Sequence, residues 1–206
     1  MAASCEVVAA RRPSRRARWT VIAVGCAVLA GGAAWSVLRD GEDPAVAVPA
    51  KVCDGSLAGD LVSPLLGEHG TAYSEEAQGF KGESTTGFCS VRGGGMGVCI
   101  HYRRWSAGFY TDESIEELIS ANGNQALKVG TAKGYVNDHA GALFVPCPKS
   151  DDPESKVQVQ AEYLRPVDAN ENGTERFRDL TVATARYVAR NLLDCKGTES
   201  LSGANP

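Results

Sequence analysis

The pattern of hydrophobic and polar positions divides the chain into one uninterrupted hydrophobic run and a longer region of short segments. The run, WTVIAVGCAVLAGGAAWSVL at 19–38, contains no charged residue. A helix of this length spans about 30 Å, the thickness of the hydrocarbon core of a bilayer. Trp19 and Trp35 lie near its ends, where indole rings favour the membrane interface. The pattern therefore predicts a transmembrane helix over 19–38.

Alternation of hydrophobic and polar residues predicts β-strands after this run. It is clearest in KVQVQAEYLR at 156–165. Every second residue there is expected to face the core (Val157, Val159, Ala161 and Tyr163), and the others to face outward (Lys156, Gln158, Gln160 and Glu162). Further strands are expected at 125–129, 134–136 and 142–147.

A β-hairpin is expected over 85–104, where TTGFCSVR and MGVCIHYRR flank three glycines. If Gly93–Gly95 form the loop, Cys89 lies directly opposite Cys99, at a separation close to that of a disulfide. A change of one residue in the loop breaks this opposition, and one of the two cysteines then reaches Cys53 instead.

Hydrophobic residues at helical spacing predict three helices. The segment 112–122 combines Asp112 as a cap with a hydrophobic face at Ile115, Leu118 and Ile119. The longest helix is expected over 174–195, with a core-facing stripe and a capping box of Asn172 and Glu175 before it. A short helix over 54–66 is weakened by Pro64, and 67–82 is expected to be loop.

Together these elements predict an α+β protein, with an antiparallel sheet packed mainly on one face against helices and stabilised by disulfides. The predicted organisation is an Arg-rich tail at 1–18, the transmembrane helix at 19–38, an extended Ala/Pro linker at 39–51 and one domain at 52–206. The segment 52–206 is long enough to form a single domain with its own hydrophobic core.

The charge distribution gives the anchor an orientation. The whole chain carries −4, with +4 in residues 1–20 and −8 in residues 39–206. The positive-inside rule places the five arginines before the run in the cytoplasm and the main domain outside the cell. The acidic balance of that domain argues against nucleic acid as a partner.

Three other interpretations of the N-terminal region are open. Gly32-Ala33-Ala34 resembles a signal-peptidase site, in which case the domain is secreted. AVGC at Cys26 allows lipidation, and Ser14-Arg15-Arg16 resembles part of a twin-arginine signal, although Arg18 departs from it. Ala23, Ala27 and Gly31 share one helix face and could pack against another helix. The retained anchor is preferred, because the hydrophobic run exceeds the usual signal-peptide core.

Seven cysteines occur in the chain, and five lie in the predicted outer domain: Cys53, Cys89, Cys99, Cys147 and Cys195. Disulfides are the expected state of cysteines outside the cytoplasm. No spacing typical of a zinc site is present. Two bridges and one remaining cysteine are expected, and these residues alone allow several pairings.

Several features together resemble uncharacterised single-pass membrane proteins of Streptomyces-type actinobacteria. They are FVPCP at 144–148, ATARYVARNLLDC at 183–195, CDG at 53–55, and the order of Arg-rich tail, anchor and Ala/Pro linker. The resemblance implies location and architecture but no activity. It also implies a Cys147–Cys195 disulfide, both cysteines lying on core-facing sides of predicted elements. Such a bridge contributes about 2–4 kcal/mol.

Residues that could carry chemistry are sparse. Asp168, Asn170 and Asn172 begin a pattern like a calcium loop, but Arg176 and Asp179 occupy later ligand positions where they are unfavourable. His69, His101 and His139 are scattered, and no nucleophile motif is present. No metal or cofactor is therefore expected.

The densest aromatic and basic cluster lies at 102–110: Tyr102, Arg103, Arg104, Trp105, Phe109 and Tyr110. Aromatic residues and arginine are enriched at binding hot spots. We therefore expect a membrane-tethered outer domain that binds a protein, a cell-envelope component or a small ligand. The alternatives are an extracytoplasmic enzyme that uses the remaining cysteine, and a structural partner assembled through its membrane helix.

Overall fold

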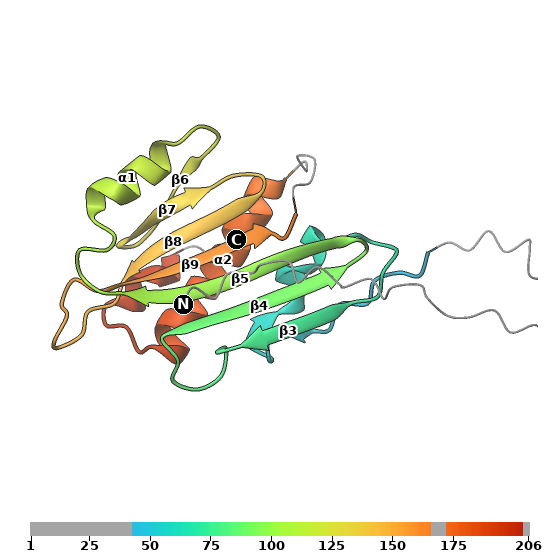
Figure 1. The fold of residues 1–206 in the computed structure, drawn as a ribbon, viewed down its shortest axis with the longest axis horizontal. Helices are drawn as coiled ribbons and strands as arrows, with labels where there is room; N and C mark the ends of the chain where they lie inside the picture. The colour runs from blue at the N-terminus through green and yellow to red at the C-terminus, as the bar shows by residue number, and fades with distance from the viewer. Residues whose placement is uncertain (1–42, 166–171, 204–206) are drawn as a thin grey trace, which may run out of the picture.

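Seven strands form one antiparallel sheet, in the order β3-β4-β5-β9-β8-β7-β6. The computed structural model describes residues 43–165 and 172–203, and it confirms the α+β class (Figure 1). The strands are β3 (Ser74–Gln78), β4 (Thr86–Gly93), β5 (Met96–Trp105), β6 (Gln125–Val129), β7 (Ala132–Val136), β8 (Ala140–Pro146) and β9 (Lys156–Tyr163).

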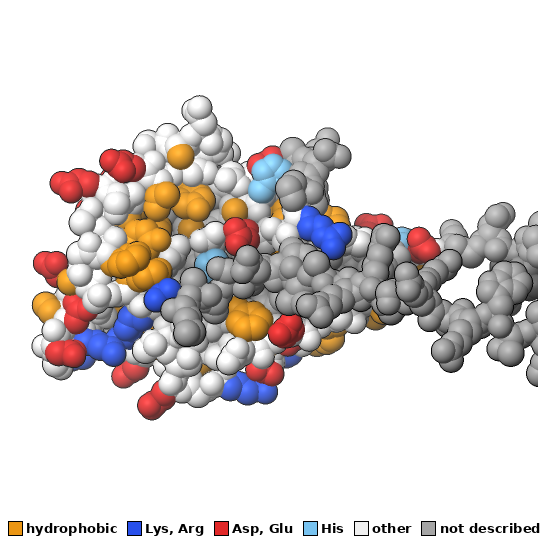
Figure 2. All heavy atoms as spheres, viewed as in Figure 1, with side chains coloured by type: hydrophobic (Ala, Val, Ile, Leu, Met, Phe, Trp, Pro, Cys, Tyr) orange, Lys and Arg blue, Asp and Glu red, His pale blue; other side chains and the backbone are white. Residues whose placement is uncertain are grey.

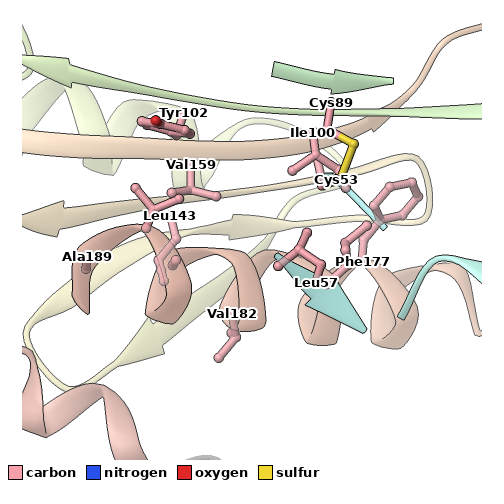
Figure 3. Close-up of a cluster of buried hydrophobic side chains, with 14 of the residues drawn as sticks. Cys53, Leu57, Cys89, Ile100, Tyr102, Leu143, Val159, Phe177, Val182 and Ala189 are labelled. Atoms are coloured by element: carbon pink, nitrogen blue, oxygen red, sulfur yellow. A yellow bond between two sulfur atoms is a disulfide. The ribbon is translucent and has the colours of Figure 1, made fainter. Parts of the chain in front are cut away.

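The hydrophobic core lies between this sheet and the long C-terminal helix. α2 (Gly173–Tyr187) crosses β8 and β9, and its last part continues as a π-helical turn, η3 (Val188–Leu192). The inward residues of β9 are confirmed: they belong to one core with Phe177 and Leu180 of α2, and the Tyr163 ring packs edge-on against Phe177. Figure 3 shows Val159 and Phe177 in this core. Gly141 of β8 lies against Phe177 and Thr181, so a side chain there would separate α2 from the sheet.

The segment predicted as a helix over 54–66 is a different structure. It contains a two-stranded ribbon of β1 (Lys51–Val52) and β2 (Leu57–Ala58), then two 3₁₀ turns, η1 (Gly59–Leu61) and η2 (Ser63–Leu65). Pro64 has no N–H for a continuous helical ladder. The leucines that suggested a helix, Leu57 and Leu65 among them, are nevertheless buried in the same core.

The strand β3 lies in the segment expected to be loop. Its sequence is SEEAQ, and four of its five residues are exposed. It is an edge strand that pairs only with β4 in the described sheet. A strand whose side chains are mostly exposed does not alternate between hydrophobic and polar residues, so its sequence gives no sign of a strand.

The β4–β5 hairpin is present, but its loop is one residue shorter than the three-glycine loop. Gly93 pairs with Met96, and Gly94 and Gly95 make the turn with φ of +58° and +80°. Positive φ at both central residues is typical of a two-residue type I′ turn. Cys89 is consequently opposite Ile100, and Cys99 is opposite Ser90, so Cys89 and Cys99 are not cross-strand neighbours.

Two disulfides join distant parts of the domain. Cys53 of the loop after β1 is bonded to Cys89 of β4, which is the outcome expected when the hairpin register shifts. Cys147, directly after β8, is bonded to Cys195, beyond the end of η3. The pairing implied by the actinobacterial resemblance is therefore present in the structure.

The short helix α1 (Asp112–Ser120) lies beside β6 and β7. Thr111, rather than Asp112, caps it, because the Thr111 side chain accepts a hydrogen bond from the Ser114 N–H. Lys133 of β7 binds Glu116 of α1, and Lys133 points away from the face that α2 covers. The two helices therefore lie on opposite sides of the sheet, and α2 shares the core face with the β1–β2 ribbon and the 3₁₀ turns that follow it.

The described end of the predicted linker already contacts the domain. The Val46 N–H donates to Glu68 O, and the Gly70 N–H donates to Pro44 O. The predicted Arg-rich tail at 1–18 and the predicted transmembrane helix at 19–38 lie outside the described residues. So do Asp168 and Asn170 of the calcium-like pattern, whereas Asn172 is described. Among the residues that are described, no helix is long and hydrophobic enough to cross a membrane.

Candidate functional site

The aromatic and basic residues at 102–110 do not form one cluster, because most of them belong to a strand. Successive side chains of a strand point to opposite faces of the sheet. Tyr102 and Arg104 point to the face covered by α2, whereas Arg103 and Trp105 point to the other face, on which α1 lies. The predicted binding surface is thus divided in two by the sheet.

Tyr102 belongs to the core. Its side chain is fully buried, it packs edge-on against Phe80 with ring centroids 5.4 Å apart, and its hydroxyl donates to the Gly79 and Ser84 carbonyls. Burial raises the pKa of Tyr102 above its ordinary value. Its role in the described structure is to hold the 79–84 loop against β5.

Arg104 lies beside the Cys147–Cys195 disulfide. Its Nη2 donates to Cys147 Sγ at 2.8 Å and to Leu193 O at 3.3 Å. Burial lowers the pKa of the guanidinium, and the nearby Asp152 and Asp151 oppose that shift. Arg104 therefore ties the end of η3 to β5 and contributes nothing to the outer face.

The remaining four residues, Arg103, Trp105, Phe109 and Tyr110, do meet, and we call them the aromatic surface. The Phe109 ring stacks on Trp105 with centroids 3.9 Å apart and planes 14° apart. The Arg103 guanidinium carbon lies 4.1 Å from the centre of the Trp105 ring. Tyr110 meets Trp105 edge-on at 5.5 Å. The stack leaves Phe109 59% exposed, the most exposed large hydrophobic side chain of the described residues.

A turn after β5 places Phe109 in the stack. The Phe109 N–H donates to Ser106 O, and Gly108 adopts φ +81°, a conformation that glycine accepts without strain. The Ala107 N–H donates to both carboxylate oxygens of Asp152. The loop that carries Phe109 is thereby tied to the neighbouring loop after β8.

Next to Trp105, outward side chains of β9 form a row, Gln158, Gln160 and Glu162, which we call the glutamine row. Trp105 Nε1 donates to Gln158 Oε1 at 2.9 Å. Gln158 Nε2 donates to Gln160 Oε1 at 3.2 Å, and Gln160 Nε2 donates to Glu162 Oε2 at 3.0 Å. The row was correctly predicted to face outward, but no sequence signal connected it to Trp105.

Two further ring side chains flank the glutamine row. His101 of β5 is opposite Gln160, and Tyr135 of β7 is two strands away on the same face. Burial lowers the pKa of His101, with Glu162 opposing, and burial together with Glu162 and Tyr110 raises the pKa of Tyr135. Figure 2 shows hydrophobic side chains gathered on this face beside α1, over β7 to β9.

The other candidate residues do not gather into a site. His69 and His139 are exposed, whereas His101 lies on β5. The described residues contain no group of His, Cys, Asp and Glu side chains that could hold a metal ion. Cys99 is fully buried in β5, and none of the five cysteines of the described domain is a free thiol. Asn172 precedes α2 with φ +77° and makes no capping bond from its side chain, so the predicted capping box does not form.

A groove of about 700 Å³ lies between α2 and the edge strand β6, which no sequence pattern indicated. Its floor is hydrophobic, with Leu127 and Val182 nearly buried. Its rim carries Arg178 next to Glu175 and Asp179. Because positive and negative side chains alternate along the rim, it favours neither an anionic nor a cationic ligand.

Comparison with known proteins found no match: no family model, no curated protein and no solved structure is similar to this chain. The aromatic surface and the glutamine row therefore have to be interpreted from their own chemistry.

Proposed function

We propose that this protein is a membrane-tethered extracytoplasmic domain that acts by binding rather than by catalysis, and that the aromatic surface is its binding site. The observation that supports the site is the Arg103–Trp105–Phe109 stack, in which a largely exposed ring is held rigid by the groups behind it. Rigid aromatic residues and arginine supply most of the binding energy at many interfaces, since little conformational entropy is lost when they bind.

Two observations support an oxidising location. The Cys53–Cys89 and Cys147–Cys195 disulfides both lie in the core of the described domain. Structural disulfides are typical of secreted and extracytoplasmic proteins and rare in the cytoplasm. Together with the hydrophobic run at 19–38 and the arginines before it, they favour an anchored domain outside the cell.

Site-specific photo-crosslinking in intact cells tests the binding site. A photoreactive phenylalanine analogue is placed at Phe109 and, in a matched control, at Leu118, a hydrophobic residue of α1 that is also exposed. We expect adducts at position 109 that are absent at position 118 and are lost when Trp105 is also replaced by leucine. No adduct at 109, or the same adducts at both positions, would overturn the assignment.

Protease treatment of intact cells tests the location. An anchored outer domain is degraded by the added protease, while a cytoplasmic marker survives and the protein stays with the membrane fraction. Recovery of the domain in the medium would support the secreted alternative, and protection from the protease would exclude both.

A further inference from the structure

The residues at the two ends of the glutamine row fix the direction in which its hydrogen bonds run. The indole N–H of Trp105 can only donate, so Gln158 must turn its carbonyl oxygen toward it. At the other end, the Glu162 carboxylate oxygen accepts, so Gln160 must turn its NH₂ toward it. Both amides are therefore held in one orientation, and neither is free to flip.

Within the described structure, each group in the row keeps hydrogen-bonding capacity. The described residues use one lone pair of each amide oxygen and one of the two N–H bonds of each NH₂ group, and the Glu162 carboxylate accepts from them through one of its oxygens. Gln158 and Gln160 thus each offer a donor and an acceptor side by side in a fixed plane. Neighbouring hydroxyl groups, each of which both donates and accepts, match such a pair.

The aromatic surface adds a flat face beside this row. Phe109 is 59% exposed, and Trp105 fixes its plane from behind. The face of an aromatic ring is electrostatically negative, and it attracts the polarised C–H groups that cover one side of a sugar ring. A stacking face next to a row of fixed amides is the combination that recognises carbohydrate.

The charges on this face argue for a neutral ligand. Arg103 lies against the Trp105 ring, Lys133 binds Glu116, and Lys156 binds the Tyr110 carbonyl and lies 4.0 Å from Asp112. The cations near the surface are thus already engaged, and Glu162 adds a negative charge. An anionic ligand that used Arg103, Lys133 or Lys156 would have to displace that residue's present contact.

From this chemistry we infer that the aromatic surface and the glutamine row together bind a neutral, unbranched glycan that lies along β9. Side chains two residues apart on a strand are separated by about 6.7 Å, so the row is about 13 Å long and contacts more than one sugar ring. The inference deepens the proposed binding function and rests on it, since both use the aromatic surface.

Titration calorimetry on the full-length protein, in a detergent without a sugar headgroup, tests this inference. The probes are cellotetraose and chitotetraose, with an unstructured peptide and inorganic phosphate as competitors from other ligand classes. We expect at least one tetrasaccharide to bind. Phe109→Ala should weaken that binding about tenfold or more, the loss that truncation of an aromatic hot spot causes.

Matched variants separate stacking, hydrogen bonding and fold. Phe109→Trp keeps a stacking face and should keep binding, and Gln160→Met keeps the side-chain length but removes the amide and should lose it. Leu118→Ala changes an exposed residue of α1 that belongs to neither the aromatic surface nor the glutamine row, and it should bind as the unaltered protein does. Thermal melts of each variant show whether a loss of binding reflects a loss of fold.

The results of calorimetry and crosslinking together separate the glycan inference from the proposed binding function. If neither tetrasaccharide binds, or if Phe109→Ala and Gln160→Met bind normally, the glycan inference is overturned. Binding of the peptide that is lost in Phe109→Ala would overturn it as well, while the aromatic surface would stand as a binding site. Absence of both glycan binding and crosslinks at position 109 would refute both proposals.

Discussion

Arg104 Nη2 lies 2.8 Å from Cys147 Sγ, which places a cation directly against the disulfide that holds the C-terminal segment to the sheet. The same nitrogen donates to Leu193 O, so one side chain contacts both the disulfide and the end of η3. Both disulfides lie in the hydrophobic core, but among the described residues no arginine donates to the sulfurs of the Cys53–Cys89 disulfide (Figure 3). The two disulfides therefore differ in their electrostatic surroundings.

This difference predicts that Arg104→Met makes the Cys147–Cys195 disulfide harder to reduce. A neighbouring cation stabilises the thiolate that reduction produces, so its removal favours the oxidised form. Equilibration with a dithiol reductant, followed by mass spectrometry of the alkylated peptides, measures both disulfides in one sample. Cys53–Cys89 is the internal control and should not change.

A second variant separates charge from hydrogen bonding. Arg104→Lys keeps the cation, and its Cys147–Cys195 equilibrium should stay near that of the unaltered protein. Arg104→Met should also lower the free energy of unfolding by about 1–3 kcal/mol, because the Leu193 carbonyl loses its donor. Equal reduction of this disulfide in all three proteins would contradict the electrostatic argument.

The two glycines of the β4–β5 turn should respond differently to alanine. Both have positive φ, which costs a residue with a Cβ about 1–2 kcal/mol. An added Cβ at Gly94 would also collide with the Gly67 backbone, whereas one at Gly95 meets no atom within 4 Å. Urea unfolding should therefore show a larger loss for Gly94→Ala than for Gly95→Ala. Equal losses would mean that the turn is not packed against Gly67.

The same turn shows why the disulfide pattern could be only partly predicted. The strands flanking the three glycines were evident from their composition, but whether two or three glycines form the loop depends on how the strands twist and pack. That single residue decides whether Cys89 faces Cys99 or Ile100. The Cys53–Cys89 disulfide was therefore one of several pairings that the sequence left open.

The candidate site shows a related limit. The alternation rule, applied to 102–105, would have separated Tyr102 and Arg104 from Arg103 and Trp105, because the strand was predicted as far as Arg104. The link between Trp105 and Gln158 could not be predicted, because it depends on β5 and β9 being neighbours although 53 residues separate the two side chains in sequence. Strand order in a sheet is a tertiary property that periodicity does not report.

Tyr102 points into the core and Phe109 stacks on the outward-facing Trp105, so substitutions at the two positions should affect stability and binding differently. Tyr102→Phe removes a buried hydroxyl that donates to Gly79 O and Ser84 O, and should cost about 1–3 kcal/mol of stability. Phe109→Ala, at a largely exposed position, should cost less than about 1 kcal/mol of stability but weaken the tetrasaccharide binding described above about tenfold or more. Chemical denaturation and titration calorimetry of both variants check this. A stability loss in Phe109→Ala equal to that in Tyr102→Phe would mean that the aromatic surface serves the fold instead.

His101 should make the fold less stable in mild acid. Burial lowers the pKa of His101 below its ordinary value of 6.5 in the folded protein, and the nearby Glu162 offsets only part of that shift. Well above pH 6.5 the His101 imidazole is neutral in both the folded and the unfolded protein, so it contributes no pH dependence to the free energy of unfolding. As the pH falls below 6.5, the unfolded chain takes up a proton that the folded protein does not, so the free energy of unfolding falls until the folded-state pKa is passed.

His101→Gln should remove this part of the pH dependence, because glutamine does not titrate and can occupy a similar volume beside Gln160. Urea unfolding of the variant and the unaltered protein, from about pH 7.5 to about pH 5, measures the difference in slope. His139→Gln is the matched control, since the His139 side chain is exposed. If His101→Gln follows the unaltered protein across this range, the acid sensitivity of the fold arises elsewhere and the burial of His101 has no consequence for its stability.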